Sequence, residues 1–420
     1  MKNELKLYYF TDSYPFSADI TWKSKEIYEA SQVFEEVIIV PFTFKTENHL
    51  MFPNNVRIEA PTLRNTLFAK PKYLKHLISL SQPQKWLKEL FRAFPKGKQA
   101  ILDWYLATIY SDIIVKRPVF KELKKNRKHQ EKCVLFFQWT MNNALMVPSL
   151  YKWGYRNIVC RMHGYDLYEF RHHQYAPYKP SILKKASACT FISKHGLDYI
   201  QKRYPFVKEK CHLHYLGAKA MKTNIVDPDN TFHVISVSRV VPLKRLELIV
   251  DALKMVNFPI KWTHIGDGYA FDAVKKKADI VQNANQNCEI EFLGWLPPQA
   301  IEDYYSNNGI GALVLVSETE GLPVVIMEAF SASVPVIATD VGGVSELVNT
   351  DNGVLLAPNP SPEDVAKAIG FLAKEDKESR SKRREQARVS YAKDFDLLNN
   401  SKAFIDFLYQ KAHSGQRRNA

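Results

Sequence analysis

The chain of 420 residues contains few cysteines and no long apolar run. Its five cysteines are odd in number, and no C-x-x-C pair suggests a zinc or redox site, so we interpret them as reduced core residues. No segment approaches the roughly 18–20 apolar residues of a membrane span, and the start M-K-N-E-L-K lacks the apolar stretch of a signal peptide. We therefore expect a cytoplasmic protein, with two domains because 420 residues exceed one ordinary core.

Positive charge is concentrated in the first half of the chain. Residues 1–225 hold 37 lysines and arginines against 18 acidic residues, a net charge of +19, whereas residues 226–420 hold 21 against 26, a net charge of −5. This asymmetry predicts an anionic partner for the first half, such as a lipid headgroup, a phosphorylated acceptor or nucleic acid.

The densest basic stretch, Lys70 to Lys98, alternates cations with Leu and aromatic residues at roughly helical spacing. This pattern resembles an amphipathic segment that lies at a membrane interface. The alternative is a pair of surface helices whose aromatic side chains enter the core. Both interpretations remain open from the sequence.

Strand-like apolar runs alternate with amphipathic helical stretches through most of the sequence. This alternation predicts an α/β fold of parallel sheets covered by helices, in two doubly wound domains. The polar segment 218–231 contains a proline, and the charge changes sign across it, so we expect domains at 1–225 and 226–395. We expect 396–420 to form a C-terminal helix that packs back on the first domain, followed by a tail.

Two carboxylates, Glu320 and Glu328, lie around an expected helix start. The apolar run 310–316 predicts a buried strand, Gly321 permits a tight turn, and Pro323 suits a first helical turn. A following apolar segment completes a βαβ crossover whose loops would face a ligand. The helix N-terminus would then face an anion.

Two cations follow an earlier strand of the second half. Arg239 closes the strand and Lys244 comes five residues later, just before a helix. A guanidinium and an ammonium at a strand end suit a diphosphate, although a surface pair at a helix start would give the same spacing. Gly266-Asp267-Gly268 is a glycine-rich turn after another strand, and alone it is an ordinary turn.

Taken together, these motifs resemble the nucleotide-sugar domain of retaining glycosyltransferases of the GT-B fold, family 4. The resemblance covers most of residues 232–372 and reaches the first half through shorter motifs. The resemblance depends on Arg239 and Lys244, Gly266-Asp267-Gly268, Phe292-Leu293-Gly294-Trp295, Glu320-Gly321-Leu322-Pro323, Glu328-Ala329, Pro335-Val336-Ile337-Ala338, and Gly342-Gly343.

In the first half, the segment from Arg161 to Tyr168 resembles the family's R-x-H-G-x-D-L-Y motif, which sits in the cleft. The resemblance implies that His163 reaches a hydroxyl of the donor sugar, against the alternative of a core histidine, and that Asp166 fixes the loop. Tyr14-Pro15-Phe16 looks like part of the family's acceptor-side loop.

The chain departs from the family at two places. Relatives often carry glycines after Y-P-F, where this chain has Ser17 to Trp22, which puts backbone approach to a phosphate there in doubt. The family's frequent glycine before V-P-V is Ser333, which is harmless if this residue needs no positive φ.

The resemblance also implies roles for the matched residues. Arg239, Lys244 and the amides after Glu320 would stabilise the departing diphosphate, while Glu320 would bind hydroxyls of the transferred sugar and Glu328 those of the ribose. The loops at Gly266 to Tyr269, Trp295 to Pro297 and Glu318 to Leu322 would set the donor, a UDP- or GDP-sugar. Retention would follow a front-face route with no protein nucleophile.

We expect no metal and no cofactor besides the donor substrate. Asp227-Pro228-Asp229 and Asp394-Phe395-Asp396 have D-x-D spacing, but the first lies in the linker and the second beside the terminal helix. His172-His173 has no companion ligands that would complete a site.

The expected function is sugar transfer to a lipid-linked or saccharide acceptor in cell-surface polysaccharide synthesis, at the inner face of the membrane through the basic first domain. One alternative is a synthase for a small soluble acceptor or a nucleotide-sugar epimerase, favoured if the protein does not associate with liposomes. The other is a non-enzymatic protein that binds nucleic acid, although the first domain has no RNA-binding or zinc motif.

Overall fold

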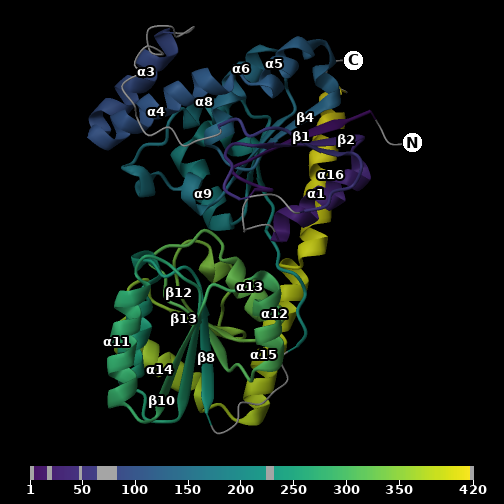
Figure 1. The fold of residues 1–420 in the computed structure, drawn as a ribbon. Coiled ribbons are helices and arrows are strands. Elements are labelled where there is room, and N and C mark those ends of the chain that lie inside the picture. Colours follow the sequence, from purple (N-terminus) through teal and green to yellow (C-terminus); the bar gives the residue numbers. More distant parts are fainter. Residues whose placement is uncertain (1–3, 17–20, 47–49, 64–82, 224–230, 417–420) are drawn as a thin grey trace. The chain divides into compact units, whose positions relative to one another are not determined.

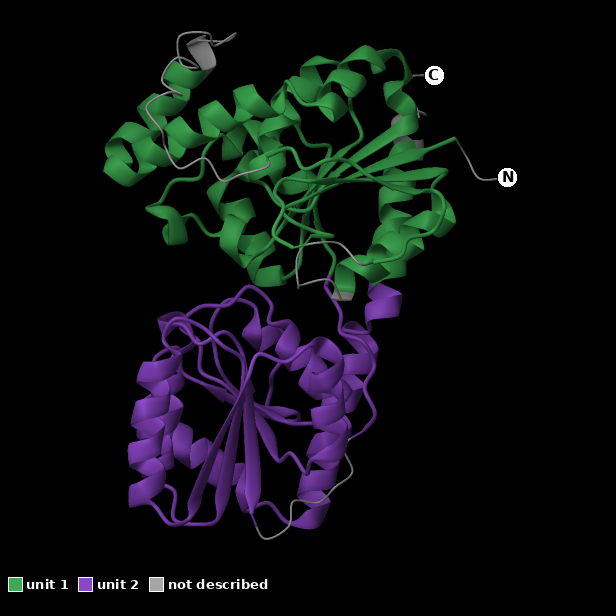
Figure 2. Ribbon diagram, in the orientation of Figure 1, with its two compact units in different colours: residues 1–214, 401–420 green, residues 215–400 purple. Residues whose placement is uncertain are grey.

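A computed structural model describes residues 4–16, 21–46, 50–63, 83–223 and 231–416. The chain forms two compact units, one of residues 1–214 with 401–420 and the other of residues 215–400 (Figure 2). The boundary expected at 225/226, the motif Asp227-Pro228-Asp229 and the departure at 17–20 lie outside the described residues.

The first unit is built on a parallel sheet in the order β3-β2-β1-β4-β5-β6-β7. Apart from the partly exposed Lys6 at the start of β1, its inner strands are buried along their length, which explains their continuous apolar sequences. The strands are β1 (Lys6–Thr11), β2 (Glu36–Pro41), β3 (Val56–Ile58), β4 (Cys133–Phe137), β5 (Ile158–Met162), β6 (Ala188–Phe191) and β7 (Cys211–Leu213).

Helices cover both faces of this sheet (Figure 1). Because side chains alternate along a strand, Tyr8 and Phe10 of β1 enter one hydrophobic core while Leu7 and Tyr9 enter the other. The helices are α1 (Thr21–Val33), α3 (Pro83–Ala93), α4 (Lys98–Ile114), α5 (Pro118–Lys125), α6 (Val147–Lys152), α7 (Gly164–Leu167), α8 (Lys179–Lys185) and α9 (Lys194–Arg203), with 3₁₀ turns at Phe94–Lys96, Arg127–Lys132, Asn142–Met146, Glu169–His172 and Pro205–Lys210.

The last helix, α16 (Leu397–Gln416), begins in the second unit and continues into the first. Phe404, Ile405 and Leu408 lie in the same hydrophobic core as Leu7 and Tyr9. The prediction that the C-terminal helix returns to the first domain is therefore confirmed.

The second unit has a parallel sheet in the order β10-β9-β8-β11-β12-β13, with helices on both faces (Figure 1). Its strands are β8 (Phe232–Val237), β9 (Ile260–Ile265), β10 (Cys288–Gly294), β11 (Ala312–Leu315), β12 (Val336–Thr339) and β13 (Gly353–Leu356). Its helices are α10 (Leu246–Leu253), α11 (Phe271–Ala284), α12 (Pro298–Asn307), α13 (Val324–Ser331), α14 (Pro362–Ala373) and α15 (Lys377–Asp394), with 3₁₀ turns at Pro242–Lys244 and Val344–Glu346.

In each unit the strand order reverses beside the first strand, so both units are doubly wound as predicted. None of the helices in the described part combines the length and apolar character needed to cross a membrane.

Helix α13 ends at a left-handed residue, Ser333, with φ 61°. Ser333 N donates to Phe330 O at 3.0 Å and Val334 N to Ala329 O at 2.8 Å, the paired bonds of a Schellman motif. This motif requires a positive φ after the helix, so the condition under which Ser333 would be harmless is not met. A serine here carries a backbone cost that the family's glycine avoids.

Candidate active site

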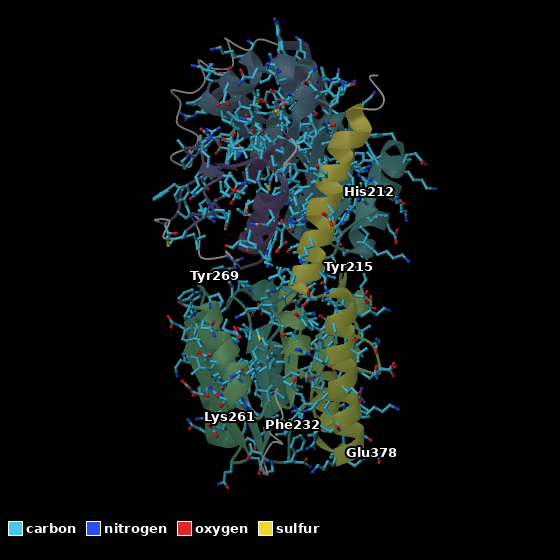
Figure 3. All side chains as sticks on the ribbon, turned by 90° about the vertical axis from the view of Figure 1, so that its right-hand side faces the viewer. His212, Tyr215, Phe232, Lys261, Tyr269 and Glu378 are labelled. Carbon is cyan, nitrogen blue, oxygen red and sulfur yellow. The ribbon has the colours of Figure 1, made fainter. Side chains whose placement is uncertain are left out.

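The motif residues of the second unit lie on loops at the carboxyl ends of its strands. Figure 3 shows this polarity: Tyr269, which follows β9, lies at the opposite end of the unit from Phe232 and Lys261, which lie near the starts of β8 and β9. Ligands of open α/β sheets bind at this carboxyl edge.

Gly266 brings two of these loops into close contact. It has φ 142°, and a Cβ built there would lie 1.8 Å from the carbonyl oxygen of Ser238, so no side chain fits. Asp267 O accepts from Val240 N at 2.9 Å, and Asp267 Oδ1 accepts from Gly268 N at 2.6 Å. The G-D-G turn is therefore joined to the loop that carries Arg239.

An ion pair joins two of the predicted residues, Lys244 and Glu320. Lys244 Nζ lies 2.6 Å from Glu320 Oε1, and the two side chains are only 20% and 12% exposed. The cation expected to bind phosphate and the carboxylate expected to bind sugar thus lie side by side, 76 residues apart in sequence.

Arg245, the neighbour of Lys244, holds this edge of the sheet together. It has φ 50°, and its guanidinium donates to Val316 O at 2.6 Å, to Ser317 O at 2.9 Å and to Pro358 O at 2.9 Å. These bonds tie the loop after β8 to the ends of β11 and β13. Arg245 was not selected from the sequence, because it reads as one more cation beside Lys244.

The loop before α13 is shaped by the glycine pair after β12. Gly342 has φ 60°, and a Cβ there would lie 2.1 Å from the carbonyl oxygen of Glu320. Gly343 N donates to Gly321 O at 2.9 Å. Gly342 therefore allows the loop after β12 to approach the carbonyl of Glu320 closely, and Gly343 binds the carbonyl of Gly321.

Helix α13 begins where the sequence predicts, with Pro323 as its N-cap residue. Leu322 is buried, whereas Glu328 on the helix is half-buried. Burial raises the pKa of Tyr305 well above its usual value, and the charge of Glu328 raises it further, which places that carboxylate near the tyrosine.

Arg239 and Trp295 are exposed on the loops that follow β8 and β10. Arg239 is exposed after β8, and Trp295 is 61% exposed directly after β10. Exposed cationic and aromatic groups at a carboxyl edge are available to a ligand.

In the first unit, His163 lies at the carboxyl end of β5, as predicted. Its ring packs against Trp139 and Trp22, with centroids 4.4 and 5.7 Å away, and Nε2 has no hydrogen-bond partner among the residues that the structure describes. Burial lowers the pKa of His163 well below its usual value, and the charges of Arg161 and Lys23 lower it further. His163 is therefore a neutral imidazole at neutral pH.

Asp166 fixes the loop that follows His163. Its Oδ1 accepts from His163 N at 2.7 Å, and its Oδ2 accepts from both the amide and the hydroxyl of Thr140 at 2.7 Å. The buried Lys179 donates to the carbonyl oxygens of Asp166 and Leu167. Lys179 and Thr140 were missed, because neither carries a motif of its own.

The loop that the resemblance assigns to the acceptor side follows β1. Tyr14 is buried in the core of the first unit, where its hydroxyl lies 3.1 Å from Ser24 Oγ, and burial raises its pKa to about 12. Pro15 is also buried, whereas Phe16 is half-buried and packs near Phe44, with centroids 5.1 Å apart.

The described residues contain no group of three histidines, cysteines or carboxylates that could hold a metal ion. Asp396 instead accepts from Tyr391 OH at 3.0 Å and from Asn399 N at 2.9 Å, at the start of α16. His172 Nε2 lies 2.6 Å from Tyr165 O.

Solved structures share this fold along nearly the whole chain. The crystal structure of Anabaena HepE in complex with UDP and glucose superposes with a TM-score of 0.64 over 97% of this chain and 100% of that one, at 16% identity. The architecture is the GT-B fold of glycosyltransferases, with two Rossmann-like domains.

The family model for glycosyl transferases group 1 matches residues 219–390, which lie in the second unit. This segment of the chain is similar to that group of glycosyltransferases. The match covers Lys244, Glu320 and the other residues selected in the second unit.

Curated relatives align with part of the chain at higher identity. A Bacillus subtilis protein, TuaC, named as a teichuronic acid biosynthesis glycosyltransferase, is 33% identical over 135 residues, 32% of this chain and 31% of TuaC. The Escherichia coli O-antigen biosynthesis glycosyltransferase WbnH is 31% identical over 126 residues, 30% of this chain and 33% of WbnH. The chain thus aligns with about a third of the length of these relatives.

Proposed function

We propose that the protein transfers a sugar from a UDP- or GDP-sugar to a hydroxyl of a lipid-linked or saccharide acceptor in cell-surface polysaccharide synthesis. The observation that carries the proposal is the ion pair of Lys244 and Glu320 at the carboxyl edge of the second sheet. It joins a group suited to phosphate with a group suited to sugar hydroxyls, within the segment that matches the glycosyltransferase model.

The reaction expels a nucleoside diphosphate, so negative charge grows on the leaving group. Lys244 and the exposed guanidinium of Arg239 are suited to stabilise this charge. Glu320 binds hydroxyls of the sugar, and Glu328 binds hydroxyls of the ribose. Both carboxylates have binding roles, so the proposal uses no protein nucleophile. The sugar keeps its configuration because the acceptor hydroxyl attacks from the face that the diphosphate leaves.

The departing phosphate oxygen takes the proton of the acceptor hydroxyl in this proposal, and neither a metal ion nor a cofactor takes part. His163 supports such a route because its lowered pKa keeps it neutral. A neutral imidazole can donate a hydrogen bond to a sugar hydroxyl or accept one from it without adding charge.

The acceptor class follows from charge and from the relatives. TuaC and WbnH are named for teichuronic acid and O-antigen biosynthesis. The net charge of +19 in residues 1–225 favours an anionic surface, which the inner face of a cell membrane supplies. We therefore place the reaction in the cytoplasm at that face, with no role for nucleic acid.

A thermal-shift screen of UDP-, GDP- and ADP-sugars tests the donor assignment. A ligand that binds the native state raises the melting temperature, so one uridine or guanosine diphosphate sugar should stabilise the wild type and lose this effect in Lys244→Ala. If no nucleotide sugar shifts the melting temperature, or if Lys244→Ala responds like the wild type, the assignment is wrong.

A further inference from the structure

Helix α3 has two apolar faces, although only one of them is buried. Its inner face contributes Trp86, Leu90 and Ala93 to a small cluster with α4. Its outer face carries Leu87 and Phe91, which are 41% and 75% exposed, and the 3₁₀ turn that follows adds Phe94 at 70%. These three residues have the i, i+4, i+7 spacing of one helical stripe.

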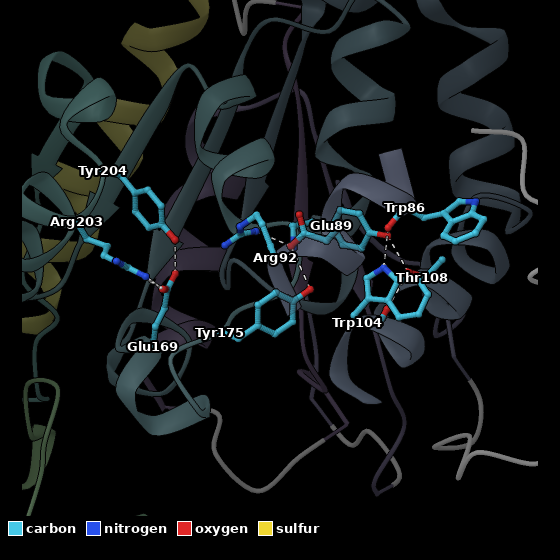
Figure 4. A network of polar contacts seen from close by, with 10 residues as sticks. Trp86, Glu89, Arg92, Trp104, Thr108, Glu169, Tyr175, Arg203 and Tyr204 are labelled. Carbon is cyan, nitrogen blue, oxygen red and sulfur yellow. Dashed lines mark hydrogen bonds and ion pairs between the residues drawn. The ribbon is translucent and has the colours of Figure 1, made fainter. Parts of the chain in front are cut away.

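A buried carboxylate fixes which face of α3 points outward. Glu89 is 6% exposed, and its Oε1 accepts from Tyr175 OH at 3.1 Å, from Tyr178 N at 2.8 Å and from Arg92 Nη1 at 2.5 Å (Figure 4). Rotating the helix to bury Phe91 would break these bonds and leave the carboxylate unpaired in the core. The exposure of Leu87, Phe91 and Phe94 is therefore built into the packing of α3.

Lysines lie beside this apolar stripe in the sequence. Lys88, Lys96 and Lys98 are all exposed. Glu89 is the one acidic residue between positions 83 and 102, and its carboxylate is turned inward. The outer face thus combines exposed aromatic rings with a single sign of charge.

We propose that the outer face of α3 and its 3₁₀ turn (Leu87, Phe91, Phe94, with Lys88, Lys96 and Lys98) docks on an anionic lipid bilayer. Aromatic rings enter the boundary between headgroups and acyl chains, while lysines pair with lipid phosphates. A patch of exposed aromatic rings marks an interaction site, and a membrane interface can bind the rings and the lysines together.

Charge argues against the two other occupants of this face. A symmetric contact between two copies would place each lysine cluster against its equivalent, which is repulsive. The neighbouring segment 64–82 carries Arg64, Lys70, Lys72 and Lys75 and no acidic residue, so its charge also repels that of the face. Anionic lipid is the occupant that complements the charge.

Lipid docking itself does not depend on the proposed function. Only its purpose, which is to bring the enzyme to a lipid-linked acceptor, rests on that function. Sedimentation with vesicles of phosphatidylcholine and about 30% phosphatidylglycerol measures the contact without donor or acceptor. The double variant Phe91→Ser/Phe94→Ser should bind about tenfold more weakly than the wild type, since each ring loses its apolar contact with the lipid. The control Phe371→Ser changes a phenylalanine on α14 that is 55% exposed, and it should bind like the wild type.

Two further measurements test the role of charge and the possibility of self-association. Vesicles of phosphatidylcholine alone, or about 0.5 M salt, should also weaken binding by the wild type. Equal binding by the wild type and the double variant would overturn the proposal, as would binding that ignores lipid charge. If light scattering showed that the wild type is a dimer and the double variant a monomer, the face would bind a second copy of the chain instead. The donor-induced thermal shift of the double variant should match that of the wild type, so a failure of lipid docking leaves the proposed function standing.

Discussion

The ammonium of Lys244 lies 2.6 Å from Oε1 of Glu320, in a contact that buries most of both side chains. A loop after β8 and a loop before α13 are thereby held together. An ammonium has three donors, so Lys244 can keep this partner and still contact a phosphate. The pair places the group proposed to bind phosphate next to the group proposed to bind the sugar.

Replacing Lys244 by alanine should reduce kcat/KM for the nucleotide sugar about 100-fold, because the leaving diphosphate loses a fixed positive charge. The matched control is Lys275→Ala, which removes a surface lysine paired with Asp279 on α11. Steady-state kinetics with saturating acceptor would measure both. A Lys244 variant as active as the Lys275 control would remove Lys244 from the site.

Asp166→Asn should destabilise the first unit by about 1–3 kcal/mol, because an amide cannot accept all the bonds from Thr140 and His163 N that the carboxylate accepts. Urea unfolding of this variant and of the exposed control Asp198→Asn would measure the loss. Activity should fall as well, since the loop after His163 loses its anchor. Unchanged stability would show that the loop holds itself without Asp166.

Ser333→Gly should stabilise the second unit by about 0.5–1 kcal/mol. Glycine adopts the left-handed conformation at φ 61° without steric cost, and this gain exceeds the extra freedom it has in the unfolded chain. Ser333→Ala is the matched control, because it removes the hydroxyl and keeps the strained Cβ. If both variants melted at the same temperature, the backbone cost assigned to Ser333 would be absent.

Stability should fall as the pH drops from about 6.5 to 4. Burial lowers the pKa of His264 to about 4, and the same cause lowers the pKa of His233 to about 4. Between these values and 6.5 the unfolded chain binds protons that the folded chain does not, so the stabilising difference is fully present above 6.5 and is lost toward 4. At pH 5 each histidine should cost about 2 kcal/mol relative to pH 7.

Urea unfolding at pH 7 and pH 5 measures this loss. His264→Gln and His233→Gln should each show a smaller difference between the two pH values than the wild type, whereas the exposed control His129→Gln should not. Equal pH dependence in all four proteins would mean that neither buried histidine is responsible.

The sequence alone predicted the doubly wound sheets, because parallel strands buried on both faces leave continuous apolar runs. It also predicted the helix start at Pro323 and the selection of Lys244 and Glu320, which lie on loops next to such strands. The particular contact between these two side chains was not predicted, since loop spacing does not determine which groups meet.

Two other features could be recognised only in the folded structure. Arg245 binds three carbonyl groups through a left-handed backbone that no local pattern announces. Ser333 has a positive φ where the residue type argues against one, because the Schellman motif after α13 overrides the preference of serine. Hydrogen bonds to distant segments hold Arg245, whereas the local bonds at the end of α13 hold Ser333.

The central claim is that the second unit binds a nucleotide sugar through Lys244, Glu320 and Glu328. Calorimetric titration with UDP and with GDP, on the wild type, Glu328→Ala and the exposed control Glu363→Ala, tests it most directly. The wild type and Glu363→Ala should bind one of the two nucleotides with equal affinity, and Glu328→Ala should bind it at least about tenfold more weakly, because the ribose loses its carboxylate partner. Absence of binding by the wild type, or equal affinity in all three proteins, would contradict the account.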